Sequence, residues 1–299
     1  MSVPLRTART FALTSLALVA FAANSLLCRK ALGAGAIDAA SFTAARVASG
    51  GAVLAVLALA RRGVVPARAP RFGGSARAAA WLVLYALAFS FAYRDLTAGT
   101  GALLLFGAVQ LTMLLAAVRG GERPPPLEWL GLALAAGGLV ALVLPGLAAP
   151  PLLAAGSMAL AGVAWGRYSL AGRGSKDALG DTAGNFARGT PIVLAALALA
   201  AVFERAGELD AGRVHASAHG LVLAVLSGAL TSGLGYVVWF AALRDLSSAR
   251  AALVQLAVPV LAAFGGVLAL GETLTPRLAA CGATILGGIA LALCARRAA

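Results

Sequence analysis

Long apolar stretches dominate this chain of 299 residues and leave few options for its fold. The composition is 61% hydrophobic and only 12% charged, with a mean hydropathy of +0.92, which a soluble domain of this size does not sustain. A helix that spans a bilayer needs about 20 mostly apolar residues. Such stretches fall near residues 11–27, 40–60, 78–93, 99–118, 127–144, 152–171, 183–203, 218–243, 249–270 and 278–295. The sequence therefore predicts an all-α polytopic membrane protein with ten transmembrane helices.

The second half of the sequence repeats motifs of the first half at an offset of 150 residues. The repeated motifs are Arg94-Asp95-Leu96 with Arg244-Asp245-Leu246, Gly121-Glu122 with Gly271-Glu272, Pro126 with Pro276, and Gly137-Gly138 with Gly287-Gly288. We expect one five-helix repeat over residues 1–148 and another over 149–299. An odd number of helices per repeat inverts the second copy in the membrane. Inverted repeats are typical of secondary transporters, whose substrate site lies near the bilayer midplane where the halves meet.

The distribution of positive charge predicts the orientation of the chain. The net charge is +13, but it follows the loops rather than forming a nucleic-acid surface. With a cytoplasmic N-terminus, fifteen Lys and Arg residues fall in inner segments and six in outer ones. The positive-inside rule then places both termini in the cytoplasm. The alternative, a cleaved signal peptide over residues 1–27, would remove a helix and break the two-half plan.

Aromatic side chains recur on matching helices of the two halves. Trp81, Tyr85, Phe89 and Tyr93 are spaced four residues apart, which places them along one face of the third span. The eighth span carries Tyr236, Trp239 and Phe240, and the sixth carries Trp165. These residues predict an aromatic substrate-binding wall, of which Tyr85, Phe89, Trp165, Tyr236 and Trp239 are the candidates. The alternative is ordinary packing or an interfacial aromatic belt, which suits Trp81 and Trp129 near helix ends.

Amide side chains inside the apolar stretches are candidate ligands for polar groups of a substrate. Gln110 and Gln255 lie in the fourth and ninth spans, and Asn24 in the first, and each amide both donates and accepts hydrogen bonds. The alternative is a hydrogen bond between helices. Pro259, one turn after Gln255, is a candidate for a gating bend or simply a tolerated kink.

Charged residues within the spans are few. Arg46 and Arg188 occupy matching places near the beginnings of the second and seventh spans, where we expect them to snorkel or bond loop carbonyls rather than bind a substrate carboxylate. No Asp or Glu lies in the middle of a span, so the usual carboxylate for proton coupling is missing. His215 and His219 fit a solvated loop better than a metal site. No catalytic constellation is recognisable, and we expect neither an enzyme nor a cofactor.

The ten-helix pattern and the Gly-Glu, Pro and Gly-Gly motifs that close each half resemble the drug/metabolite transporter superfamily, specifically its EamA-type exporters. Within it, residues 99–110 and 164–170 are similar to the YddG-type amino-acid exporters. The resemblance implies a basket of helices around a central cavity. It also implies that the third, fourth, eighth and ninth spans line the cavity and that the fifth and tenth pack at the periphery.

Together with the resemblance to bacterial exporters, these observations predict an exporter in the bacterial inner membrane. We expect it to move a broad range of amino acids, aromatic and other neutral ones included, and related small metabolites by alternating access. Two alternatives stay open. One is an exporter of hydrophobic drugs, and the other is a non-transporting membrane scaffold. The expected partners are a small-molecule substrate and the lipid bilayer, with the chain as a monomer or homodimer and no nucleic acid.

Overall fold

The computed structural model describes residues 3–64, 72–121, 125–144, 149–173, 175–205, 214–246, 251 and 254–298. The predicted repeat boundary near 148 and Glu122 lie outside them. The helices are α1 (Val3–Gly33), α2 (Ala39–Val64), α3 (Ala76–Ala92), α4 (Ala98–Arg119), α5 (Pro126–Val143), α6 (Leu152–Gly172), α7 (Ala178–Arg205), α8 (Ala218–Leu226), the π-helix η2 (Ser227–Leu234), α9 (Gly235–Leu243), α11 (Ala257–Leu270) and α12 (Pro276–Ala298). Since α8, η2 and α9 follow one another without a break, the described chain forms ten helical rods, which confirms the all-α prediction.

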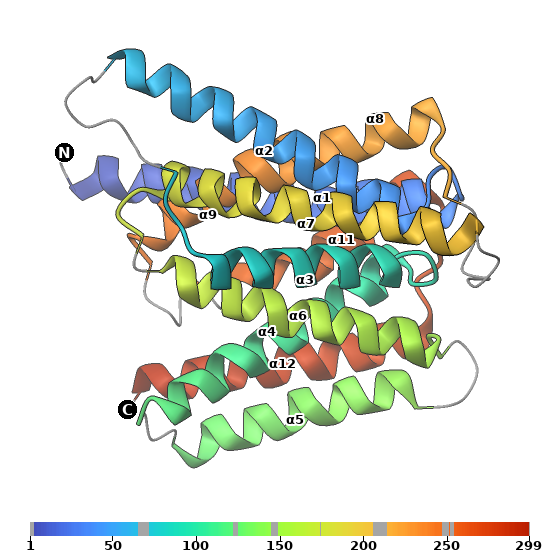
Figure 1. Ribbon diagram of the computed structural model, residues 1–299. Helices are drawn as coiled ribbons and strands as arrows, with labels where there is room; N and C mark the ends of the chain where they lie inside the picture. The colour runs from blue at the N-terminus through green and yellow to red at the C-terminus, as the bar shows by residue number, and fades with distance from the viewer. Residues whose placement is uncertain are drawn as a thin grey trace.

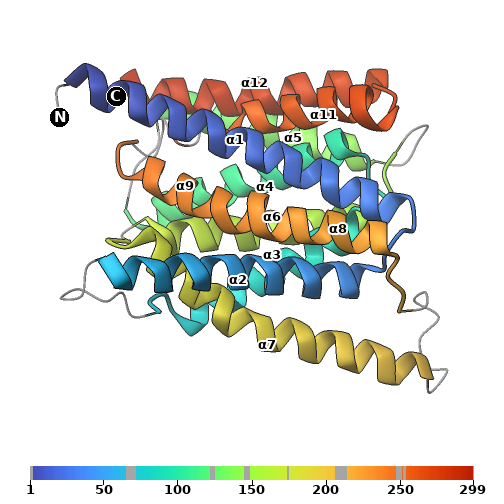
Figure 2. The same cartoon turned by 90° about the horizontal axis from the view of Figure 1, so that it is seen from above.

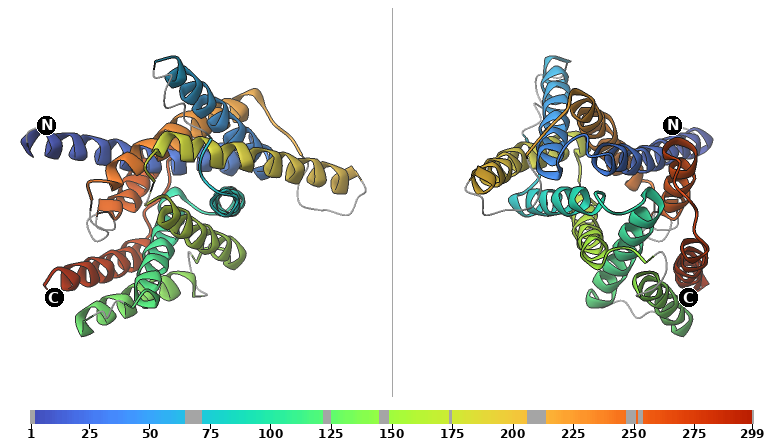
Figure 3. Two further views of the ribbon diagram at one scale, coloured as in Figure 1. Left: turned by 60° about the vertical axis from the view of Figure 1, so that its left-hand side comes forward. Right: turned by 90° about the vertical axis from the view of Figure 1, so that its right-hand side faces the viewer.

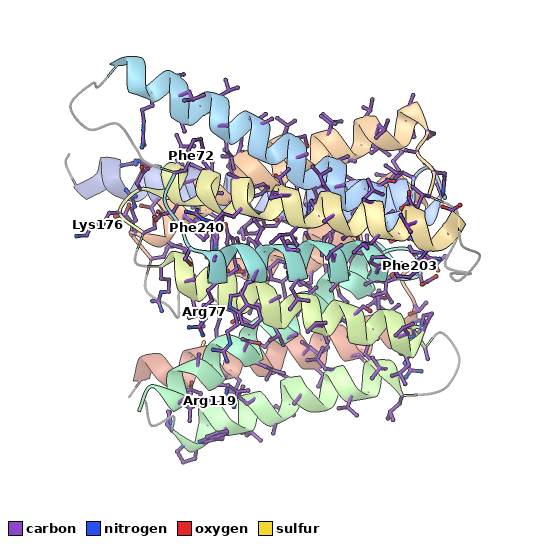
Figure 4. The ribbon with its side chains drawn as sticks, viewed as in Figure 1. Phe72, Arg77, Arg119, Lys176, Phe203 and Phe240 are labelled. Carbon is purple, nitrogen blue, oxygen red and sulfur yellow. The ribbon has the colours of Figure 1, made fainter. Side chains whose placement is uncertain are left out.

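The helices run side by side along a common direction, and α1 begins at the same end of the bundle at which α12 ends (Figures 1 and 2). Among the residues that the structure describes, six helices are long and apolar enough to cross a membrane, and α3, α11 and part of α12 are shorter apolar helices. Figure 4 places Arg77, Arg119 and Lys176 toward the end that holds the termini, and Phe203 at the opposite end. The chain is thus built as a multi-pass membrane protein.

Close packing of glycines joins α5 to α12 at one edge of the bundle, with α7 at the opposite edge (Figure 3). A Cβ atom on Gly131 would lie 2.4 Å from the carbonyl oxygen of Gly288, and one on Gly288 would lie 2.6 Å from that of Gly131. The two backbones approach this closely only because neither residue has a side chain, which is how membrane helices commonly associate. By contrast, a Cβ atom on Gly137 or Gly287 would meet nothing within 4 Å. The peripheral position of the fifth and tenth spans is confirmed.

The eighth span is interrupted in its middle by the π-helix η2, which the sequence did not predict. This wider helical turn packs against α2, and a Cβ atom on Gly228 would lie 2.1 Å from the Arg46 carbonyl oxygen. π-Helical turns are rare and often mark functional sites. Here the segment brings three hydroxyl side chains, Ser227, Thr231 and Ser232, into the interior.

Candidate functional site

Aromatic rings from four helices meet in the centre of the bundle. Trp165 of α6 lies 4.7 Å from Tyr236 of α9 and 5.0 Å from Tyr85 of α3, measured between ring centroids. Phe21 of α1 lies 5.5 Å from Trp165 and 5.6 Å from Trp239. We call these five residues the aromatic cluster. All five are at most 5% exposed, so they form an interior surface rather than an interfacial belt.

The aromatic cluster borders a small closed cavity, the central cavity, with a volume of about 10 Å³. Its lining residues come from α1, α3, α4, α6 and α9, and they are Phe21, Asn24, Ser25, Tyr85, Phe89, Leu105, Phe106, Trp165 and Tyr236. A volume of this size holds about one water molecule. The bundle is therefore closed around the cavity in this conformation, and admission of a larger molecule requires helices to separate.

Arg46 is the only basic residue among the buried side chains that the structure describes. It does not itself line the central cavity, but it bonds two residues that do, Tyr85 and Tyr236. Its side chain, on α2, is 1% exposed. Nη2 donates to the hydroxyl oxygens of Tyr85 (3.0 Å) and Tyr236 (2.9 Å), and Nε donates to Ser232 Oγ (2.9 Å). The guanidinium also lies over the rings of Tyr85 and Phe89, at 5.1 and 4.9 Å from their centroids. Nη1 has no hydrogen-bond partner among the described residues.

A second polar network ties α1 to the π-helix. Asn24 Oδ1 accepts hydrogen bonds from Ser227 Oγ (2.7 Å) and Thr231 Oγ1 (3.1 Å), and its Nδ2 donates to the Tyr85 hydroxyl at 3.3 Å. Tyr85 thus joins Asn24 to Arg46. The network presents hydrogen-bond donors at the cavity while both accepting positions of the Asn24 oxygen are already occupied.

The structure brings together most of the predicted site residues. Asn24, Tyr85, Phe89, Trp165 and Tyr236 all line the central cavity. Trp239 is fully buried one layer behind it, against Phe21.

Other predicted residues lie away from the cavity lining. Gln110 is buried on α4, one turn beyond the lining residue Phe106. Gln255 donates to the Ala251 carbonyl (3.3 Å), and its Oε1 has no partner among the described residues. Pro259 is the third residue of α11, which begins at Ala257. The residue before the helix, Leu256, still has helical backbone angles (φ −63°, ψ −19°). None of the described residues of the ninth span lines the central cavity, whereas α1 and α6, which the resemblance did not imply, both contribute to the lining.

The two matching arginines behave differently. Arg188 donates to the carbonyl oxygens of Gly73 (2.6 Å) and Gly184 (2.9 Å), which confirms the prediction of carbonyl bonding. The same prediction is wrong for Arg46, because α2 packs against η2 and α3 and leaves the guanidinium no route to the interface. The signal that could have marked Arg46 as a buried residue is that it lies within an apolar span with no carboxylate close to it in sequence. The clustered hydroxyls of Ser227, Thr231 and Ser232 gave a weaker one, and nothing in the sequence singled out Phe21.

One ion pair lies at each end of the bundle, between the described residues of different helices or the loops beside them. At the end away from the termini, Arg29 Nε lies 3.1 Å from Glu272 Oε1, and Glu272 Oε2 accepts from the Ala98 N–H at 2.8 Å. At the end that holds the termini, Arg61 Nη2 lies 2.6 Å from Asp177 Oδ2. Partial burial alone would raise the pKa of Asp177, but the bonds from Arg61 and from the Gly180 N–H hold it below its ordinary value.

Comparison with known proteins identifies the family. The profile of the EamA-like transporter family matches residues 152–294, from α6 into α12. A Pseudomonas aeruginosa protein described as "Uncharacterized protein PA1977" is 54% identical over 289 residues, which cover 96% of each chain. The chain belongs to the EamA-like transporter family. A solved structure titled "Crystal structure of protein" matches this EamA-like chain with a TM-score of 0.62 and 24% identity, over 95% of this chain and 97% of that one. At that identity, the likeness supports the fold alone.

Membership confirms the resemblance to the drug/metabolite transporter superfamily. An EamA-like transporter is a multi-pass membrane protein that moves solutes. The closed central cavity, beside a buried guanidinium and among aromatic rings, is the candidate site at which this EamA-like transporter holds its solute.

Proposed function

We propose that this EamA-like transporter exports amino acids, aromatic and other neutral ones included, and related small metabolites that carry a carboxylate. It works in the bacterial inner membrane with both termini in the cytoplasm. In this proposal it stands close to the YddG-type amino-acid exporters. The halves 1–148 and 149–299 are inverted five-helix repeats that alternate the access of the central cavity between the two sides.

The observation that carries the proposal is the free donor of Arg46. A carboxylate is the natural partner of a guanidinium that has an unsatisfied Nη1, because charge-assisted hydrogen bonds between the two are short and strong. The aromatic cluster beside it offers Trp165 and Phe21 to an apolar or aromatic side chain. One anchor for a common carboxylate and adaptable rings for a variable side chain suit a broad range of amino acids.

The packing of the helices supports the two-half plan. The pairs α2 with α7, α4 with α11 and α5 with α12 each join one helix of the first half to its counterpart in the second. Other contacts come in equivalent pairs, in which each helix is replaced by its counterpart from the other half. The contact between α1 and α9 is equivalent to the one between α6 and α3. The contact between α4 and α6 is likewise equivalent to the one between α11 and α1. A pseudo-twofold relation between the halves produces this pattern.

Alternating access requires each end of the bundle to open in turn. The Arg29–Glu272 pair and the Arg61–Asp177 pair are positioned to hold the two ends closed. Because no acidic residue lies in the middle of a span, movement down the substrate gradient accounts for transport without a proton carrier.

Exchange in liposomes tests the proposal. Purified protein is reconstituted with unlabelled phenylalanine or leucine inside, and uptake of the same radiolabelled amino acid is followed. We expect exchange above that of protein-free liposomes. Arg46→Gln should reduce it at least tenfold, while the matched control Arg188→Gln should stay close to the wild type. Trp165→Phe keeps the ring but removes the buried N–H and should alter substrate preference.

Other outcomes would overturn the proposal. If folded protein exchanges no amino acid but extrudes hydrophobic dyes, the apolar lining of the cavity serves drug export instead. If no compound moves and substitutions at Arg46 leave a protein partner bound, the chain is a membrane scaffold.

A further inference from the structure

The charge of the central site is unbalanced. Arg46 makes its hydrogen bonds to three neutral hydroxyl groups, those of Tyr85, Tyr236 and Ser232. All eleven acidic residues of the chain lie, in sequence, within four residues of a helix end or between helices. No ion pair joins Arg46 to a carboxylate in the part of the chain that the structure describes. Within the described residues, the central site therefore holds a positive charge with no carboxylate paired to it.

A buried charge without a counter-ion is unfavourable in a medium of low dielectric, and the cost falls when an anion binds next to it. The Nη1 donor of Arg46 marks where such an anion gains hydrogen bonds. The aromatic rings over which the guanidinium lies stabilise the charge only in part. An anionic group of a substrate can supply the missing counter-ion.

The same site is poorly equipped for an ammonium group. The amide oxygen of Asn24 already accepts two hydrogen bonds, from Ser227 and Thr231. The faces of Tyr85 and Phe89 are already engaged by Arg46. A zwitterion would bring a second positive charge into a site that keeps a net charge of one, whereas a monoanion would bring the net charge of the complex to zero.

We propose that the central site binds small organic monocarboxylates with an aromatic or apolar tail, as anions, in preference to zwitterionic amino acids. This inference rests on the proposed function, since it uses the same carboxylate anchor. Each net crossing then carries one negative charge outward. A potential that is negative in the cytoplasm drives export, and 100 mV sustains a gradient of roughly 50-fold for a monovalent ion.

The experiment uses labelled phenylpyruvate and phenylalanine, which differ by an oxo group in place of the ammonium. Homoexchange of either compound is electrically neutral, so it reports transport alone. Net efflux is then measured at potentials clamped with potassium and valinomycin, with protein-free liposomes for leakage. We expect phenylpyruvate efflux to be several-fold faster when the compartment that holds it is negative, and slower when it is positive. Phenylpyruvate should also inhibit exchange at a concentration at least tenfold lower than phenylalanine.

The two hypotheses fail separately. Exchange of both compounds with efflux that ignores the potential, or with equal inhibition by the two, overturns this inference and leaves the proposed function in place. Absence of exchange by every carboxylate, from protein that elutes as a single folded species, overturns both. Arg46→Gln should abolish the preference for phenylpyruvate, whereas Arg188→Gln should retain it.

Discussion

The contact between the π-helix and α2 leaves no room for a methyl group, so Gly228→Ala should disturb the site through the backbone. The added Cβ atom would lie 2.1 Å from both the Arg46 carbonyl oxygen and Ser49 Oγ. Cβ atoms essentially never lie under 3.0 Å from such an atom, so α2 and η2 must separate by the difference, 3.0 − 2.1 = 0.9 Å. A separation of that size along the line of the Nε–Ser232 Oγ hydrogen bond would lengthen it from 2.9 Å to about 3.8 Å, which is no longer a hydrogen bond.

Two measurable effects follow. Overpacking of a tight interior contact costs about 1–3 kcal/mol, which corresponds to a fall of roughly 2–10 °C in Tm. Displacement of the guanidinium weakens a charge-assisted hydrogen bond to the substrate, which is worth about 1.5–3 kcal/mol. The substrate concentration that half-saturates exchange should therefore rise roughly 10- to 100-fold.

The assay compares Gly228→Ala with Gly137→Ala, whose added methyl group on α5 meets nothing within 4 Å. Tryptophan fluorescence during heating gives Tm in detergent, and exchange in liposomes gives the substrate dependence. We expect the control to match the wild type in both. A Gly228→Ala protein with unchanged Tm and unchanged substrate dependence would refute the close approach of η2 to α2 and with it this placement of Arg46.

Two further predictions concern the ends of the bundle. Glu272→Gln breaks the ion pair with Arg29 and should loosen the closure at that end of the bundle. A small thiol reagent should then modify the buried Cys28 of α1 several-fold faster than in the wild type. An unchanged rate of modification would show that the ion pair does not protect the interior. The pKa of Asp177 is lowered in the folded protein. Its pair with Arg61 therefore stabilises the closed end at any pH above the ordinary carboxyl pKa of about 4, and this contribution is lost as the pH falls through the lowered pKa. The Tm of the wild type should therefore drop more than that of Asp177→Asn when the pH is lowered from 6 to about 3. If the Tm of both proteins falls by the same amount over this range, the ion pair does not stabilise the folded protein.

The architecture was predictable because lipid imposes a simple rule on the chain. Stretches of about 20 apolar residues can only be helices, and their number follows from counting. The four-residue spacing of Tyr85 and Phe89 likewise predicts a shared helix face, and the structure places both on the central cavity.

The interior chemistry was harder to predict, because it depends on which helices touch. Arg46 and Arg188 occupy matching sequence positions, yet one is enclosed by η2 and α3 while the other reaches loop carbonyls. Whether an arginine is buried depends on the helices that pack around it, not on the sequence of its own segment. The π-helix escaped prediction for a similar reason, since its wider turn is stabilised by the contacts of Ser227 and Thr231 with Asn24 rather than by a local sequence preference.

The π-helix has a consequence for how this span tolerates changes in length. In an ordinary α-helix, loss of one residue turns everything beyond it by about 100°, so a deletion early in α3 would swing Tyr85 out of the interior. A π-helical turn already contains surplus chain, and the loss of one residue from Ser227–Leu234 is absorbed when the turn tightens to the α-helical pattern. Tyr236 and Trp239 then keep their direction while the hydroxyl groups before them shift. We therefore expect this short stretch to tolerate the loss of one residue, which would remodel the polar side of the site and leave its aromatic wall in place.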